Sequence, residues 1–157
     1  MRNKRHSSAR NRYNTRGVWW SDTERRETPT RVFDDSSYFS SIFELDIYRR
    51  LREFSSIVVF RQYRLTVKDA TEQYPRIDWR CDFRVEHKTN HEKFLNIEVK
   101  GYFQPEFKNT LKYLEFFSPY EYSHLVLVAK DHQKVDNYFR TWTVDDIPCI
   151  LETRGLK

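Results

Sequence analysis

The chain is 157 residues long, with 38% hydrophobic, 17% aromatic and 32% charged residues and a formal net charge of +5. That many apolar and aromatic side chains can fill a core, so the composition excludes an intrinsically disordered protein. No apolar run approaches the ~20 residues of a membrane span, and the two cysteines cannot form a disulfide framework or a four-cysteine zinc site.

The positive charge is concentrated at the start of the chain. Residues 1–32 contain nine lysines and arginines against three acidic residues, and residues 1–33 lack hydrophobic periodicity. This predicts a flexible basic arm, followed by a folded domain over residues 34–157. Such an arm suits the phosphate backbone of nucleic acids, although a solubilising tail has the same composition. The arm residues that we expect to contact nucleic acid are Arg2, Lys4, Arg5, Arg10, Arg12 and Arg16.

The first regular elements are predicted after residue 40. Phe43, Ile47 and Leu51 recur at helical spacing behind the polar start signal DDSSYFSS, which predicts a helix over residues 41–54. The β-branched and aromatic run over residues 56–67 predicts a strand. Two more strands are expected over residues 78–86 and 94–100, joined as a hairpin by a polar loop.

These last two strands alternate between apolar and charged residues. In the first, Asp82 is expected to share a face with Arg80 and Arg84, because side chains two residues apart point the same way. In the second, Glu98 and Lys100 share the face opposite to the apolar residues, about 6–7 Å apart along the strand. Two carboxylates and an ammonium on neighbouring strands form a compact site for a divalent metal ion and a phosphodiester.

The rest of the chain completes an α/β pattern. A helix is predicted from Pro105 to residue 118, followed by a buried strand over residues 124–130. Residues 134–142 are expected to form a short helix, and residues 147–152 a last strand or sheet edge. The order predicts a mixed sheet flanked by helices, with a parallel β-α-β crossover through the helix after Pro105.

The order of these elements, together with Asp82, Glu98 and Lys100, resembles the PD-(D/E)XK nuclease superfamily. The resemblance covers roughly residues 37–130 and implies a restriction-endonuclease-like core, α-β-β-β-α-β. A glutamate from the first helix often joins the site in that superfamily, and Glu44 occupies this place. The sequence departs from the usual motif at Cys81, which stands where a proline commonly precedes the aspartate.

The resemblance implies a role for each of these residues. Asp82, Glu98 and the carbonyl oxygen of Val99 would bind Mg²⁺, with Mn²⁺ able to substitute, and Glu44 would hold a second metal ion. Lys100 would position the attacking water and neutralise charge in the transition state. Two residues beyond the motif are further candidates for phosphate binding: Gln104 and Lys108.

Small members of this superfamily include Holliday junction resolvases and phage endonuclease I-type enzymes, which this chain most resembles. The resemblance implies a Mg²⁺-dependent endodeoxyribonuclease that cleaves branched DNA as a homodimer, in the cytoplasm of a bacterial or phage-infected cell. One alternative is a site-directed DNA endonuclease of the homing, restriction or transposase end-cleaving type. The other is a nucleic-acid-binding module without catalysis.

Each candidate residue also has a plainer interpretation. Ser41 and Glu44 have the spacing of a capping box, in which the glutamate returns to the start of its own helix. Asp82 could pair with a neighbouring arginine, and Glu98 with Lys100 could form a solvated sheet edge.

Overall fold

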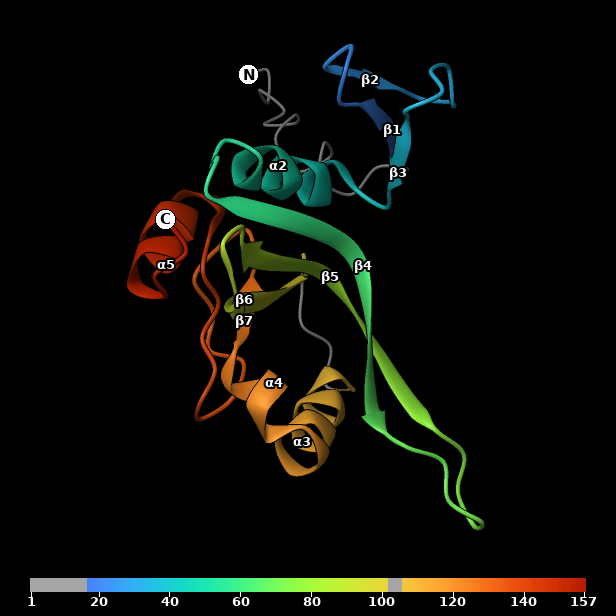
Figure 1. Cartoon of the computed structure of the whole chain (residues 1–157), viewed down its shortest axis with the longest axis vertical. Helices are drawn as coiled ribbons and strands as arrows, with labels where there is room; N and C mark the ends of the chain where they lie inside the picture. Colours follow the sequence, from blue (N-terminus) through green and yellow to red (C-terminus); the bar gives the residue numbers. More distant parts are fainter. Residues whose placement is uncertain (1–16, 102–105) are drawn as a thin grey trace, which may run out of the picture. The chain divides into compact units, whose positions relative to one another are not determined.

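A computed structural model describes residues 17–101 and 106–157 (Figure 1). The chain divides into two compact units, Met1–Arg49 and Arg50–Lys157. Within the described ranges, no helix is long and apolar enough to cross a membrane.

The first unit contains a small antiparallel sheet in the order β2-β1-β3, built from β1 (Val18–Ser21), β2 (Arg26–Thr28) and β3 (Ser37–Phe39). The expectation of an arm without regular structure is therefore wrong for residues 18–28. Strands of three or four residues are too short to produce a period, but the apolar side chains of Val18 and Trp20 are buried and anchor β1.

The helix predicted over residues 41–54 is confirmed as α2 (Ile42–Leu51). Phe43, Ile47 and Leu51 are buried, as their spacing requires. The helix begins after Ser41, whose Oγ accepts a hydrogen bond from the Glu44 backbone N–H at 3.0 Å.

The second unit is built on a mixed sheet in the order β4-β5-β6-β7. β4 (Ile57–Lys68), β5 (Ile77–His87) and β6 (Asn90–Val99) are antiparallel neighbours, and β7 (Leu125–Val128) runs parallel to β6. The predicted α/β class, hairpin and parallel crossover are confirmed. The hairpin loop is shorter than expected, since the two strands extend until only residues 88 and 89 separate them.

The crossover runs through α3 (Phe107–Phe117) and α4 (Pro119–Ser123). Leu111 and Leu114 of α3 are buried in a core cluster that also contains Leu125 and Leu127 of β7 and Val67 of β4. In the register of β6 and β7, Asn96 pairs with Leu125 and Glu98 with Leu127. The helix therefore covers the sheet face that carries Asn96 and Glu98.

Two predictions near the C-terminus are wrong. Residues 134–142 contain isolated β-bridges instead of a helix, joining Lys134 to Arg140 and Trp142 to Val128. Residues 147–152 form α5 (Ile147–Thr153) instead of a strand. The apolar residues Ile147, Ile150 and Leu151 fit a helical period, and the turn η1 (Val144–Asp146) starts the helix through a capping box between Thr143 and Asp146.

Candidate active site

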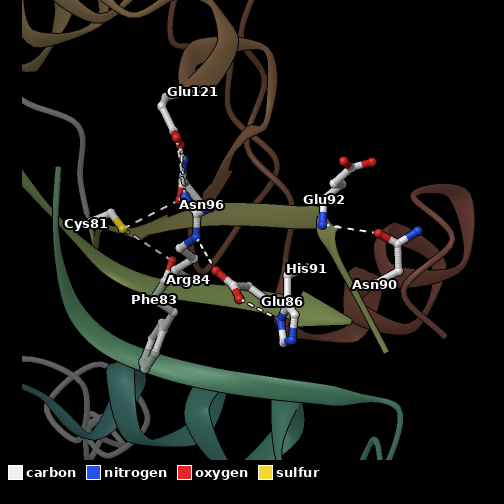
Figure 2. A network of polar contacts seen from close by, with 9 residues as sticks. All are labelled: Cys81, Phe83, Arg84, Glu86, Asn90, His91, Glu92, Asn96 and Glu121. Atoms are coloured by element: carbon white, nitrogen blue, oxygen red, sulfur yellow. Dashed lines mark hydrogen bonds and ion pairs between the residues drawn. The ribbon is translucent and has the colours of Figure 1, made fainter. Parts of the chain in front are cut away.

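The alternation of β5 breaks at Asp82, which corrects the uniform pattern expected from the sequence. Cys81 Sγ lies 4.0 Å from Asn96 Oδ1, on the side of the sheet that carries Arg84, whereas Phe83 points the opposite way (Figure 2). On the neighbouring strand, the Tyr63 ring lies 4.8 Å from the Arg84 guanidinium, although regular alternation would separate them. The break leaves Asp82 between the two faces, at the end of the β5–β6 pairing.

Asp82 is held by hydrogen bonds from both neighbouring strands. The paired residues of β5 and β6 end with Phe83 opposite Ile97. One step further along, Asp82 Oδ2 accepts a hydrogen bond from the Val99 backbone N–H at 2.7 Å, and Oδ1 accepts one from Gln62 Nε2 at 3.2 Å. The carboxylate therefore joins β5 to the end of β6 and has a defined position before any ligand binds.

Gln62 is a further residue of the site, and the sequence does not predict it. Its φ is +49°, a left-handed conformation that is uncommon for residues other than glycine, and it lies in β4 where the alternation breaks. Nothing in the local sequence marks this residue, because neither glycine nor asparagine occurs there. The position of Gln62 beside Asp82 follows only from the pairing of β4 with β5.

The conformation of Gln62 leads to a stability prediction. Gln62→Gly is expected to be more stable than Gln62→Ala by about 1 kcal/mol, because glycine adopts a positive φ without steric cost. This order is the reverse of the usual one inside a strand, and the alanine variant controls for loss of the amide. Urea unfolding of the two variants measures the difference; an alanine variant of equal or greater stability would show that the position is not strained.

Glu98 is almost fully buried, with 3% of its surface exposed. Its Oε1 lies 2.6 Å from Lys100 Nζ, whereas Oε2 has no hydrogen-bond partner within the described part of the chain. Burial raises the pKa of Glu98 to about 7, and the nearby charge of Asp82 contributes, while Lys100 acts in the opposite direction. The plainer interpretation of Glu98 and Lys100 was a solvated sheet edge, and the burial of Glu98 contradicts it.

Lys100 is placed by the parallel pairing of β6 and β7. Its backbone N–H donates to the Val128 carbonyl at 3.0 Å, one step beyond the end of β6. The side chain is partly exposed, and Nζ lies 5.9 Å from the centre of the Phe107 ring at the start of α3. The ammonium therefore lies between the buried carboxylate and solvent, where an anion can reach it.

A buried polar network supports the same face of the sheet (Figure 2). Arg84 Nε donates to Glu86 Oε1 at 2.7 Å and Nη1 to Glu121 Oε2 at 3.1 Å. Asn96 Nδ2 also donates to Glu121 Oε2, at 2.6 Å, and the Arg84 guanidinium lies 3.7 Å from the centre of the Phe94 ring. Arg84 is thus occupied by these two glutamates, so its charge is already balanced within the network.

The pair of carboxylates fits a hard divalent cation. Mg²⁺ keeps several waters in proteins and needs only one or two carboxylates. Glu98 Oε2, which has no hydrogen-bond partner in residues 17–101 and 106–157, supplies a buried oxygen ligand. The described residues contain no group of three or more histidine, cysteine, aspartate or glutamate side chains close enough to hold a metal ion. A cation here would therefore depend on Asp82 and Glu98, with the Val99 carbonyl as the remaining predicted ligand.

Glu44 lies in the first unit, and its contacts there are local. Its Oε2 accepts hydrogen bonds from Ser40, at 3.1 Å from the backbone nitrogen and 2.5 Å from Oγ. Together with the bond from its own N–H to Ser41, this is a capping arrangement shifted by one residue from the usual box. The contacts agree with the capping interpretation, and the metal-binding role of Glu44 stays a prediction.

Of the remaining predicted residues, only Lys108 lies within the described ranges. Lys108 is exposed in the first turn of α3. The others lie outside the described residues: Arg2, Lys4, Arg5, Arg10, Arg12, Arg16 and Gln104. Comparison of the sequence with protein-family models and with curated proteins found no match.

Proposed function

We propose that this protein is a metal-dependent endonuclease that hydrolyses phosphodiester bonds in DNA. The observation that carries the proposal is the grouping of Asp82, Glu98 and Lys100 at the end of the β5–β6 pairing. Here one carboxylate is anchored, the other is buried with one oxygen that has no hydrogen-bond partner among the described residues, and an ammonium lies 2.6 Å from its other oxygen. The element order α2-β4-β5-β6-α3-β7 also supports the resemblance to the PD-(D/E)XK superfamily.

The chemistry divides between a bound Mg²⁺ and the protein's own groups. The metal ion would lower the pKa of a bound water and attract the phosphate oxygens. Asp82 is preorganised by its bonds to Val99 and Gln62, so holding the ion requires no rearrangement of the carboxylate. Lys100 offsets the charge of Glu98 in the metal-free protein; beside a bound cation, it can instead donate to a phosphate oxygen and neutralise charge that develops during hydrolysis.

The preferred substrate in this proposal is branched DNA, cleaved by a homodimer. This part rests on the resemblance to junction-resolving enzymes, which make two symmetric nicks and therefore need two active sites. A site-directed endonuclease would use the same catalytic residues and differ only in what it recognises. The two are separated by comparing DNA substrates of one sequence and different shape.

The proposal is tested with a synthetic four-way junction and a linear duplex of the same sequence, each incubated with Mg²⁺ or Mn²⁺. We expect paired nicks near the branch point, and a loss of about a hundredfold or more in rate for Lys100→Ala. Lys88→Ala is the matched control, because Lys88 is an exposed lysine in the turn of the same hairpin. Its rate should equal that of the wild type.

The other outcomes are equally informative. Equal cleavage of the linear duplex would favour the site-directed endonuclease. DNA binding without cleavage in either metal ion would overturn the enzymatic proposal and leave a nucleic-acid-binding module.

The basic N-terminal residues give a further prediction. Deleting residues 1–16 is expected to weaken DNA binding and to flatten its salt dependence, by about 0.9 in logarithmic slope for each phosphate that these residues neutralise. The deletion must stop before β1, since Val18 and Trp20 anchor the first sheet. Binding titrations between ~50 and ~200 mM salt measure the slope; an unchanged slope would mean that these residues are a solubilising tail.

A further inference from the structure

Beyond Asp82, β4 and β5 continue without β6 as a two-stranded ribbon (Figure 1). The pairs of β5 with β6 stop at Phe83, whereas the pairs of β5 with β4 continue to Ile77 opposite Lys68. The ribbon therefore begins at the candidate active site and leads away from it.

The two faces of the ribbon differ. One face carries Val67, Ile77 and Trp79, which pack in the core cluster with Leu111 and Leu114 of α3. This contact holds the ribbon against the helix. The other face carries residues that are exposed: Gln62, Arg64, Thr66 and Arg80.

The exposed face places two arginines directly opposite each other. Arg64 pairs with Arg80 in the register of β4 and β5, and like charges in such a pair destabilise a sheet. Arg64 donates to Asp78 Oδ2 from both Nε and Nη2, with Nε at 2.9 Å. Arg80 makes no side-chain hydrogen bond or ion pair within the part of the chain that the structure describes.

A single carboxylate faces the positive charge on this surface. Asp78 also receives Arg76 Nε at 2.6 Å and Thr66 Oγ1 at 3.1 Å, so it is shared among several donors. This surface thus has three arginines for the one aspartate that lies between them: Arg64, Arg76 and Arg80. Other acidic residues lie only at the two ends of this surface: Asp82 of the candidate site at one end, and Asp69 and Glu72 in the loop past Lys68 at the other.

We propose that this exposed face binds the phosphate backbone of the nucleic-acid strand that leads into the active site. Arg80 is two residues from Asp82 along β5, so their Cα atoms lie about 6–7 Å apart, and a strand bound along this face would reach the sheet edge at Asp82, which lies between the two faces. Guanidinium groups bind phosphate through two hydrogen bonds, and a phosphate between Arg64 and Arg80 would remove their mutual repulsion. The direction of the bound strand rests on the proposed nuclease function. The binding of phosphate rests only on the charge of this surface.

The test measures DNA binding in EDTA, where no cleavage occurs, by fluorescence anisotropy of a labelled duplex and a labelled four-way junction. Arg80→Gln is expected to weaken binding about threefold to tenfold and to reduce the salt slope by about 1, and the double variant with Arg64→Gln by about 2. The matched control is Arg52→Gln, an exposed arginine between α2 and β4. Arg52→Gln removes the same charge and should reduce the salt slope of DNA binding by less than Arg80→Gln does.

Thermal unfolding keeps the result interpretable. Because Arg80→Gln removes a like-charge pair, its melting temperature should equal or exceed that of the wild type while its DNA affinity falls. Two results would overturn the inference. One is a loss of DNA affinity that appears only together with a lower melting temperature, and the other is a salt slope equal to that of the wild type.

The inference and the proposed function fail in different ways. If the wild type cleaves DNA but the arginine variants bind and cleave it normally, the enzyme stands and the ribbon surface does not. If the variants lose salt-dependent binding but the wild type never cleaves, the ribbon surface stands and the nuclease proposal does not.

Discussion

Asp82→Asn is expected to lower the rate of DNA cleavage by about a hundredfold or more while DNA affinity stays equal or rises. The change removes a charged metal ligand but keeps the shape of the side chain. The asparagine oxygen can still accept the hydrogen bond from Val99, and the Gln62 amide can turn to accept one from the new NH₂ group. The loss of one negative charge beside a phosphate favours binding.

The measurement is a single-turnover cleavage assay beside an anisotropy titration, both on the same junction. Asp145→Asn is the matched control, because Asp145 is an exposed aspartate in η1, and it should leave both quantities unchanged. A fully active Asp82→Asn protein would end the proposed mechanism. A variant that lost binding and unfolded at lower temperature would assign Asp82 a structural role.

Glu98→Gln is expected to stabilise the metal-free protein at pH 8 by up to about 3 kcal/mol and to change little at pH 4.5. The pKa of Glu98 is raised from 4.5 to about 7 in the folded protein, and a difference of one in pKa corresponds to about 1.4 kcal/mol. The unfolded chain therefore releases this proton first as the pH rises. Stability associated with Glu98 is complete below pH 4.5 and is lost as the pH rises through about 7.

The glutamine variant cannot ionise, so its stability should lack this contribution to the pH dependence. Urea unfolding in EDTA at several pH values between ~4.5 and ~8 measures the difference. Glu92→Gln, an exposed glutamate earlier in β6, is the control and should follow the wild type. If Glu98→Gln were less stable than the wild type by the same amount at every pH, Lys100 would fully compensate for the buried charge.

These two predictions describe a site that lowers the free energy of unfolding of the metal-free protein. Glu98 is buried beside a second carboxylate and pairs with the partly exposed Lys100, although a neutral side chain there would be more stable. Such an arrangement is common where a protein binds a cation, since the bound ion supplies the missing charge. The same substitution should therefore stabilise the protein and abolish cleavage.

The alternating runs of β5 and β6 are sufficient to predict much of the second unit. Apolar residues at every second position specify strands, and the long apolar run over residues 124–130 indicates a strand covered on both faces. The parallel pairing of β6 with β7 follows from the helix between them. The spacing of Glu98 and Lys100 can be found in this way, because it depends only on strand geometry. The placement of Asp82 depends instead on the break in β5 and on its hydrogen bonds to β4 and β6.

Other features depend on contacts between segments distant in the sequence or on capping residues. The prediction of a strand in place of α5 is wrong because Ile147, Ile150 and Leu151 lie in a short apolar run that fits either period, and Thr143 and Asp146 decide for the helix. The strands of the first unit escape prediction because none exceeds four residues. Short strands form only when a partner supplies their hydrogen bonds.

The order of the main elements and the residue types of the candidate site follow from local periodicity and spacing in the sequence. How that site is built depends on contacts that exist only in the folded chain. The pairing of β4 with β5 brings Gln62 to Asp82, and the end of the β5–β6 ladder offers the Val99 N–H to the same carboxylate. Burial in the folded chain raises the pKa of Glu98, because desolvation depends on what covers a side chain and not on its neighbours in the sequence.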